Sequence, residues 1–258
     1  MLHQLRDPYA LIIFVGSGLT ANFITMSSLK IPAMVLIPQG EFLMGRENGM
    51  DNERPVHRVF LDAFMIGRFP LTNREFRSFV EETGASEPPF WSEESFSHED
   101  KPVVGISWHG AAAYCDWLSR IAAKRFRLPT EAEWERAARG NLDEMLYPWG
   151  NEHPSDRPFR GYDSETGGPE RVGQSEPNGF GLFDMAEGVH EWCSDFYDPH
   201  YYHRSPEKNP KGPSSGKRRA SRGGSWRHRI KFSRCAARSS LDPSFSYADY
   251  GFRVAMTL

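Results

Sequence analysis

The sequence contains little cysteine. Its 258 residues include three cysteines, Cys115, Cys193 and Cys235. A small disulfide-stapled scaffold normally needs more cysteines, and an even number of them. None of the three stands in a CxxC or clustered Cys/His pattern typical of zinc ligands. The sequence therefore argues against a secreted disulfide framework and against a structural zinc site.

An excess of charge of one sign is also lacking. Lysine and arginine total 31 residues and aspartate and glutamate total 34, so the formal net charge is -3. The two signs are interleaved along the chain rather than gathered into a basic segment. Such a chain offers no electrostatic reason to bind nucleic acid or a membrane surface. We therefore expect the partner or substrate to be a peptide, a protein or a small molecule.

A long apolar run is missing as well. Residues 9–26 are mildly apolar, but glycine, serine, threonine and asparagine interrupt them, and a membrane-spanning helix needs about 20 mainly apolar residues. As a signal peptide, the segment has an acidic Asp7 before it and a poor cleavage site. We expect an unstructured leader over residues 1–30 and a single domain over residues 31–258. A cytoplasmic location is favoured, with a signal peptide as the alternative.

Glycine, proline and aromatic residues are plentiful. The 23 glycines and 19 prolines predict many turns and irregular loops, and the aromatic fraction of 13% supplies large side chains for a core. Short alternating segments predict strands near residues 34–37, 40–45, 57–64, 181–184, 189–193, 220–226, 233–238 and 251–256.

Caps and apolar spacing indicate three helices. Thr72 and Thr130 each stand before a helical pattern with a glutamate three residues on, which is a capping box. Ser107 caps a third helix over residues 108–124, whose apolar residues recur at helical spacing. A few helices in a loop-rich, mostly antiparallel background predict an α+β domain.

Five sequence blocks follow one another along the chain. They read MVLIPxGxFxMG, PVH through LTN, LPTEAEWE with YPWG, PNGxGLxDM with EW, and RGGSW with SRCAARS and GFRV, at residues 34–45, 55–73, 128–150, 177–192 and 222–254. In this order they resemble the formylglycine-generating enzyme family, also called the sulfatase-modifying factors, over about residues 33–256. The resemblance implies the loop-rich, C-type-lectin-like fold of that family.

The chain departs from the family in its last block. In the family's enzymes, a Cys-x4-Cys pair between the Gly-Gly-Ser and the Ala-Ala-Arg binds copper(I) and carries out the oxidation. Here residues 227–232 read RHRIKF, without cysteine. The thiol of Cys235 cannot by itself supply the two thiolates that hold copper(I). We therefore expect a family member without the reactive pair and without copper, in which Cys235 is a buried apolar side chain.

Three side chains are candidates for a catalytic role at the altered site. The resemblance places Ser225 in the family's cleft, and His190 where the enzymes commonly carry a tryptophan beside the metal. His228 lies in the replaced segment among basic residues. A histidine there can be a ligand or an acid–base group, because it titrates near neutrality. The alternatives are a strand-end hydroxyl for Ser225 and a solvated loop for His228.

The resemblance also implies a structural calcium ion. Asp184 and Glu191 match side-chain ligands of the family, and Glu187 and Val189 match positions that supply backbone carbonyls. Calcium prefers several oxygen ligands of this kind. The alternative is that Asp184 caps a turn and that Glu191 pairs with an arginine.

Two functions follow from these patterns. The first is an oxidoreductase or modifying enzyme that uses chemistry other than the missing cysteine pair. It predicts that Ser225, His190 and His228 converge in one pocket, with a perturbed histidine pKa. The second is a non-catalytic binding module for a peptide, glycan or protein, with the aromatic and basic loop 197–213 at its surface. It predicts that the three side chains are dispersed and that an aromatic patch is exposed. Formylglycine generation itself is disfavoured by the missing thiols.

Overall fold

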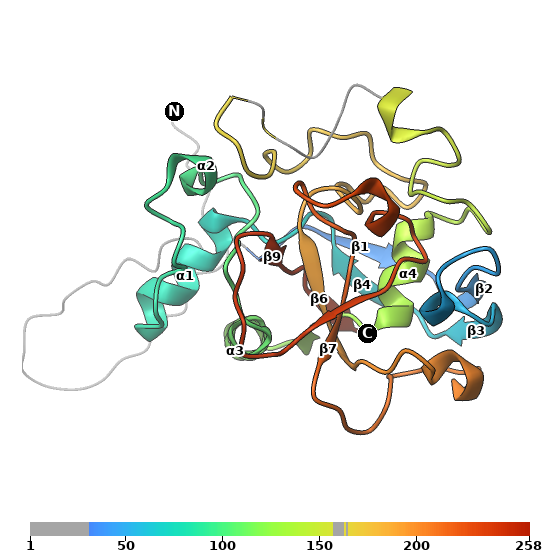
Figure 1. Ribbon diagram of the computed structural model, residues 1–258. Helices are drawn as coiled ribbons and strands as arrows, with labels where there is room; N and C mark the ends of the chain where they lie inside the picture. The colour runs from blue at the N-terminus through green and yellow to red at the C-terminus, as the bar shows by residue number, and fades with distance from the viewer. Residues whose placement is uncertain (1–30, 157–162, 164) are drawn as a thin grey trace, which may run out of the picture.

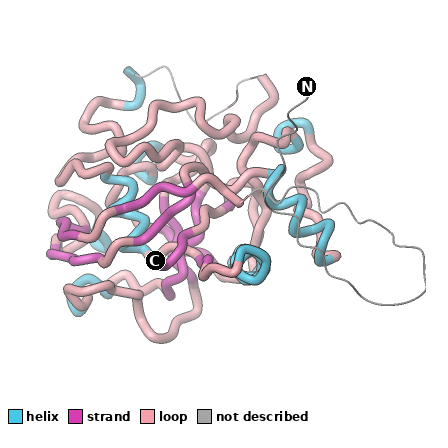
Figure 2. Tube along the Cα trace, turned by 180° about the vertical axis from the view of Figure 1, so that it is seen from behind, coloured by secondary structure: helices cyan, strands magenta, loops and turns pink. Residues whose placement is uncertain are grey.

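The computed structural model describes residues 31–156, 163 and 165–258. The expected leader over residues 1–30 lies outside the described residues, and the domain boundary at residue 31 stays a prediction. Loops make up most of the trace (Figure 2). Within the described part of the chain, no helix is both long enough and apolar enough to cross a bilayer.

The helices are few and the strands are short. The helices are α1 (Asn73–Thr83), α2 (Glu94–Ser97), α3 (Trp108–Ala122) and α4 (Glu131–Arg139). The strands are β1 (Met34–Ile37), β2 (Gly40–Met44), β3 (His57–Leu61), β4 (Phe64–Gly67), β5 (Phe126–Arg127), β6 (His190–Phe196), β7 (Arg219–Arg222), β8 (Ser239–Leu241), β9 (Tyr250–Gly251) and β10 (Ala255–Thr257).

The described strands form three small sheets. Their orders are β1-β4-β10-β5, β2-β3 and β8-β7-β6-β9. The pairing of β6 with β9 is parallel and the other pairings between the described strands are antiparallel. Figure 1 places α1 and α2 at one end of the molecule and β2 and β3 at the other, with β6 and β7 between them. This arrangement confirms the predicted α+β class.

The three longer helices begin where the sequence predicts. At Thr72 and Thr130, the threonine side chain accepts a hydrogen bond from a backbone amide three residues on, and the glutamate there returns the bond. Ser107 caps α3 in the same way, without the returning bond. Helix α3 ends at Ala122, earlier than predicted, because Ala123 adopts a left-handed conformation with φ of 50°.

Two of the predicted strands are loops. Residues 181–184 turn at Asp184, whose φ of 55° is left-handed and does not occur in a regular strand. In residues 233–238, the backbone N–H of Cys235 donates to Leu146 O at 2.8 Å rather than to a neighbouring strand. The other predicted strands are present, with shifted ends or divided in two.

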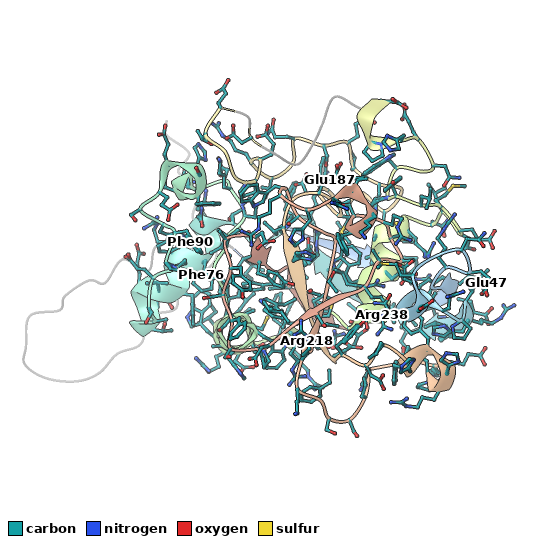
Figure 3. All side chains as sticks on the ribbon, in the orientation of Figure 1. Glu47, Phe76, Phe90, Glu187, Arg218 and Arg238 are labelled. Carbon is teal, nitrogen blue, oxygen red and sulfur yellow. The ribbon has the colours of Figure 1, made fainter. Side chains whose placement is uncertain are left out.

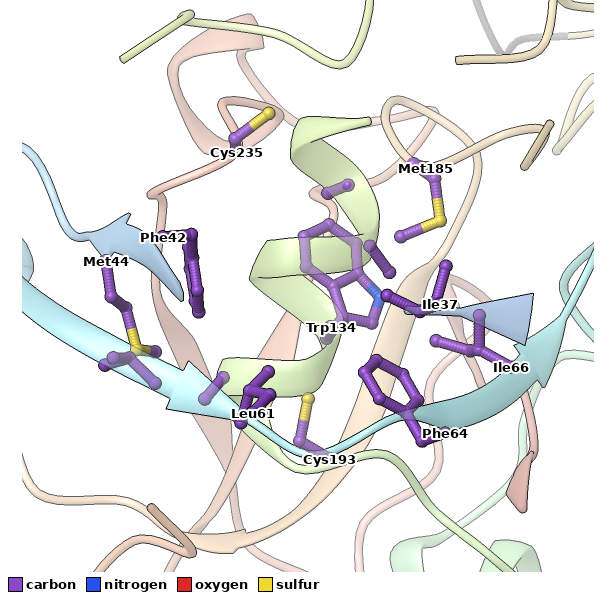
Figure 4. Close-up of a cluster of buried hydrophobic side chains, with 14 of the residues drawn as sticks. Ile37, Phe42, Met44, Leu61, Phe64, Ile66, Trp134, Met185, Cys193 and Cys235 are labelled. Carbon is purple, nitrogen blue, oxygen red and sulfur yellow. The ribbon is translucent and has the colours of Figure 1, made fainter. Parts of the chain in front are cut away.

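The main core surrounds Trp134 of α4. Trp134 is fully buried, and Figure 4 shows the side chains that pack around it, among them Ile37, Phe64, Ile66 and Met185. A second core joins α1 to α3, where the ring of Phe76 stacks on that of Tyr114 at a centroid distance of 5.7 Å. Phe76 is labelled beside α1 in Figure 3. The aromatic residues that the composition supplies therefore fill both cores.

All three cysteines are buried. Cys193 and Cys235 lie in the core around Trp134 (Figure 4), and Cys115 lies in the second core. Burial raises the pKa of the Cys235 thiol to about 12, and burial also raises the pKa of Cys115 and Cys193. Each cysteine is therefore a neutral thiol in the core, as the sequence predicted for Cys235.

Two glutamates of α4 hold three buried arginines. Glu135 accepts hydrogen bonds from Arg139 and Arg222, and Arg238 donates to both carboxylate oxygens of Glu131 at 2.8 and 2.9 Å. Burial alone would raise the pKa of Glu135, but the charges of Arg139 and Arg222 lower it below its ordinary value. This network ties α4 to β7 and to the segment that precedes β8.

Asp195 of β6 makes the stability depend on pH. Asp195 is 3% exposed, and burial, with the nearby Glu131 carboxylate, raises its pKa from 3.8 to about 7. The folded protein therefore holds this proton more tightly than the unfolded chain does. The contribution of this proton to the stability of the fold is complete below about pH 4 and is lost as the pH rises through about 7. Between these limits, the free energy of unfolding falls by up to about 1.4 kcal/mol per pH unit.

We expect Asp195→Asn to remove this pH dependence. The amide does not titrate, and its oxygen can still accept the hydrogen bond from Glu131 N. Urea unfolding should show the variant gaining stability relative to the wild type between about pH 5 and about pH 8. Asp116→Asn, at an exposed aspartate of α3, is the control and should follow the wild type. A difference between Asp195→Asn and the wild type that is the same at both pH values would show that Asp195 is not the group responsible.

Candidate functional site

The three predicted site residues lie together. His190 begins β6 and stands opposite Tyr250 of the parallel strand β9, with His190 N donating to Asp249 O at 2.8 Å. Ser225 and His228 follow β7, which pairs with β6 on its other side. The sheet therefore brings three segments that are remote in sequence to one place.

A glycine turn directs the segment that follows β7. Gly223 and Gly224 have φ of 93° and 68°, which glycine adopts without steric cost. A Cβ on Gly224 would lie 2.5 Å from Ser233 Oγ, so a larger residue would displace the loop. The turn positions Ser225 and His228 against β9.

The two histidines contact each other directly. His190 Nε2 and His228 Nδ1 are 2.7 Å apart, a hydrogen bond whose donor depends on the tautomers. The other ring nitrogen of His228, Nε2, is 3.5 Å from Asp249 Oδ2. We refer to His190, His228 and Asp249 as the His–His–Asp cluster. The side chain of His228 is 38% exposed, so it is the member of the cluster that solvent and a substrate can reach.

Asp249 is the site residue that the sequence interpretation missed. Its side chain is fully buried, and it accepts hydrogen bonds from Ser225 Oγ at 3.0 Å and from the guanidinium of Arg227 at 2.5 Å. The available signal was its position inside the last block, two residues before the GFRV segment that begins at Gly251. Because the carboxylate has two donors on the loop after β7, it anchors that loop to β9.

His190 is held as a neutral imidazole. Its side chain is 1% exposed, and burial lowers its pKa to about 3, although the Asp249 carboxylate acts in the opposite direction. Its ring stacks on Tyr250 at a centroid distance of 4.8 Å and an interplanar angle of 25°. Its Nδ1 has no hydrogen-bond partner among the described residues. A buried, uncharged imidazole thus faces the half-exposed His228.

The geometry argues against Ser225 as a nucleophile. A serine nucleophile donates its hydrogen bond to a histidine base, whereas Ser225 Oγ donates to Asp249. The residue Ser225 is also 2% exposed. Ser225 is therefore placed to orient the carboxylate. The two imidazoles and the carboxylate together can move a proton along the line from Asp249 to His190, or share a metal ion.

The residues predicted to bind calcium are engaged in other contacts. Arg253 Nη2 donates to Glu191 Oε1 at 2.7 Å, while Arg253 Nε and Trp134 Nε1 each donate to Oε2 at 2.6 Å. Asp184 accepts from two groups of the 173–175 loop, a backbone amide at 2.6 Å and a serine hydroxyl at 2.7 Å. These contacts match the alternative, a turn cap and an arginine pair.

Each carboxylate oxygen of Glu191 already has a donor, but Oε1 has one and Oε2 has two, so the remaining acceptor site for an ion is on Oε1. Glu187 and Val189 lie in the turn before β6. Their carbonyls would be the backbone ligands. Calcium binding by Asp184, Glu187, Val189 and Glu191 stays a prediction.

The loop 197–213 is not the aromatic surface that the binding-module hypothesis predicts. Tyr201 and Tyr202 are 9% and 3% exposed and belong to the main core. Tyr202 lies under Arg238, whose guanidinium carbon is 4.1 Å from the ring centroid. In a loop-rich fold, loop aromatics such as these complete the core, because the few regular elements cannot fill it alone. The exposed aromatics near the cluster are instead Phe245 and Tyr247, at 49% and 44%.

The fold and the site together define a class. Small curled sheets in a loop-rich chain, with a Gly-Gly-Ser turn beside β6, are the features of a formylglycine-generating-enzyme-like protein with a C-type-lectin-like fold. The solved structure of PvdO from Pseudomonas aeruginosa has this fold, with a TM-score of 0.76 and 27% identity over 88% of this chain and 95% of that one. The family model of the sulfatase-modifying factor enzyme 1-like domain matches residues 21–258. The chain belongs to this family.

Relatives of known name confirm the family. The formylglycine-generating enzyme of Mus musculus is 33% identical in an alignment that covers 88% of this chain and 76% of the mouse protein. The serine/threonine-protein kinase pkn1 of Chlamydia pneumoniae is 36% identical in an alignment that covers 87% of this chain but 38% of the chlamydial protein. The chain therefore spans less than two fifths of the length of the chlamydial relatives it matches.

Proposed function

We propose that this chain is a modifying enzyme whose reactive centre is the His–His–Asp cluster in place of a cysteine pair. The observation that supports this function is that Ser225 and His228 meet the buried carboxylate of Asp249 and that His190 contacts His228. Convergence and a lowered histidine pKa are two of the features that the enzyme hypothesis predicts. The substrate is a peptide, a protein or a small molecule.

The chemistry available to the chain supports imidazole rather than thiol reactivity. The three thiols are buried and have raised pKa values, so they supply no thiolate at neutral pH. A half-exposed imidazole beside a carboxylate can donate or accept a proton at a bound substrate. In this arrangement, His228 meets the substrate, His190 holds His228 from the inner side, and Asp249 orients both the loop and the ring.

Exposed aromatic side chains lie near the cluster. The ring of Tyr247 is 6.3 Å from that of Tyr250, and Tyr250 in turn stacks on His190. Phe245 packs edge-on against Tyr247 at a centroid distance of 6.1 Å. These rings offer an apolar contact surface for a substrate held at His228.

The experiment first finds a substrate and then removes the cluster. The wild-type protein is incubated with a peptide library and a metabolite extract, and mass spectrometry identifies molecules whose mass changes with time. His190→Phe keeps a flat ring for the stack on Tyr250 but removes both ring nitrogens. His228→Gln removes the imidazole that meets the substrate. Because a positioned acid–base group contributes typically about 10²–10⁴ in rate, we expect turnover by His228→Gln to fall at least ~100-fold, and turnover by His190→Phe to fall as well because His228 loses its inner partner.

His203→Gln is the matched control, because His203 is exposed on the turn Tyr201–Arg204, outside the cluster. It should keep the wild-type rate. Full turnover by folded His190→Phe and His228→Gln would refute the proposed centre. Stable capture of one partner without any change of its mass would instead identify a binding module.

A further inference from the structure

We propose that the His–His–Asp cluster binds one divalent first-row transition-metal ion, such as zinc(II) or iron(II), through one nitrogen of each histidine and one oxygen of Asp249. This inference rests on the proposed function, since it names the cofactor of the same centre. Within the described part of the chain, these residues are the group of histidine, cysteine and carboxylate side chains gathered closely enough to hold an ion.

The distances suit an ion of this size. One ligand atom from each residue lies within 4.8 Å of the others, and His228 Nε2 is 3.5 Å from Asp249 Oδ2. Metal–nitrogen and metal–oxygen bonds of about 2.0–2.2 Å place neighbouring ligand atoms roughly 3 Å apart or slightly more. The 2.7 Å contact of His190 with His228 is shorter than this. The ring of His228 would therefore turn outward, and its exposed position leaves room for that movement.

Two of the three ligands are rigidly held before any ion arrives. The Asp249 carboxylate is fixed by Ser225 Oγ and Arg227, and His190 is fixed by its stack on Tyr250. Groups that orient the ligands in this way tune metal sites and are part of their construction. Ser225 and Arg227 would be such supporting groups.

The Nε2 of His190 is paired poorly without an ion. His190 is 1% exposed, and the partner of its Nε2 is another imidazole, Nδ1 of His228. A buried polar group of this kind calls for an explanation. An ion between the two rings would accept a lone pair from each imidazole. It would replace the hydrogen bond between His190 and His228, which holds a single proton between two nitrogens.

The ligand types select the class of metal. Imidazole nitrogen suits zinc, copper, iron and nickel, while thiolate is the ligand that favours copper(I). Three protein ligands leave open positions for water or substrate, as in catalytic rather than structural sites. Since His228 is on the solvent side of the cluster, the open positions would face outward.

Metal binding is tested on the whole chain without reference to activity. After dialysis against a chelator, the protein is titrated with zinc(II) by calorimetry and with cobalt(II) by visible absorption, which reports the coordination of the ion. We expect one equivalent to bind. We expect His228→Gln and Asp249→Asn each to weaken binding at least ~100-fold, the upper end of what loss of a supporting partner costs. His203→Gln, an exposed histidine in another loop, should bind as the wild type does.

Unfolding curves establish that each variant is folded. Because His228 is half-exposed, we expect His228→Gln to disturb folding least. The absence of saturable binding by the wild type would overturn the inference, as would unchanged binding by both folded variants. If no metal binds but His228→Gln abolishes turnover in chelator-treated buffer, the proposed enzyme stands and the metal site fails. If metal binds at the cluster and no substrate is turned over, the metal site stands and the proposed enzyme fails.

Discussion

Replacing Glu135 by glutamine is expected to lower the free energy of unfolding by about 3–5 kcal/mol. Glu135 is fully buried and accepts hydrogen bonds from Gly45 N, Arg139 and Arg222. A neutral amide leaves two buried guanidinium groups without their shared negative charge, and its NH2 group cannot accept their hydrogen bonds. Urea-induced unfolding followed by tryptophan fluorescence measures the loss.

Glu41→Gln makes the same chemical change at the surface. Glu41 pairs with Arg58, and their side chains are 51% and 61% exposed. Exposed pairs contribute about 0–1 kcal/mol, so this variant should unfold close to the wild type. A loss at Glu135→Gln no larger than that at Glu41→Gln would mean that the buried network does not hold α4 in place.

Arg253→Met is expected to cost about 3–5 kcal/mol of unfolding free energy as well. Arg253 is fully buried and donates to both oxygens of Glu191, to Gly67 O at 3.0 Å and to Phe183 O at 3.1 Å. It therefore joins β6, β4 and the loop that carries Asp184. Its removal leaves the Glu191 carboxylate buried with Trp134 as its remaining donor among the described residues.

A double substitution distinguishes loss of packing from an unpaired charge. If the unpaired carboxylate causes the loss, Glu191→Met combined with Arg253→Met should be more stable than Arg253→Met alone, because replacing both partners of a buried pair by apolar groups is often tolerated. Thermal and urea unfolding of both variants give the comparison. A double variant less stable than the single one would show that the pair contributes through its shape and not through charge compensation.

Local signals in the sequence were reliable where the chain makes contacts with itself over a few residues. Thr72, Thr130 and Ser107 cap their helices as predicted, because a capping bond joins residues three apart. The predicted strands near residues 181–184 and 233–238 were wrong. Leu182 and Cys235 of these segments lie in the core around Trp134, and a buried loop shows the same apolar residues as a buried strand.

The same distinction between local signals and long-range contacts applies to the residues of the site. The family blocks pointed to His190, Ser225 and His228, but not to Asp249, whose one signal is its place two residues before the GFRV segment. Asp249 enters the site because β9 runs parallel to β6 and puts residue 249 beside His190. Strand pairing between segments about sixty residues apart is a property of the folded chain, so it could not be predicted from a single sequence.

What the sequence determined by itself was the family, the α+β class, the helix starts and the loss of the cysteine pair, since each depends on residue identity or on contacts within one helical turn. What only the tertiary structure decided was the partner of each buried charge. Glu191 is paired with Arg253, and the tyrosines of the loop 197–213 lie in the core. The gathering of two histidines and Asp249 was decided in the same way. These contacts join residues far apart in the chain, and burial strengthens them because the interior screens charge less than water does.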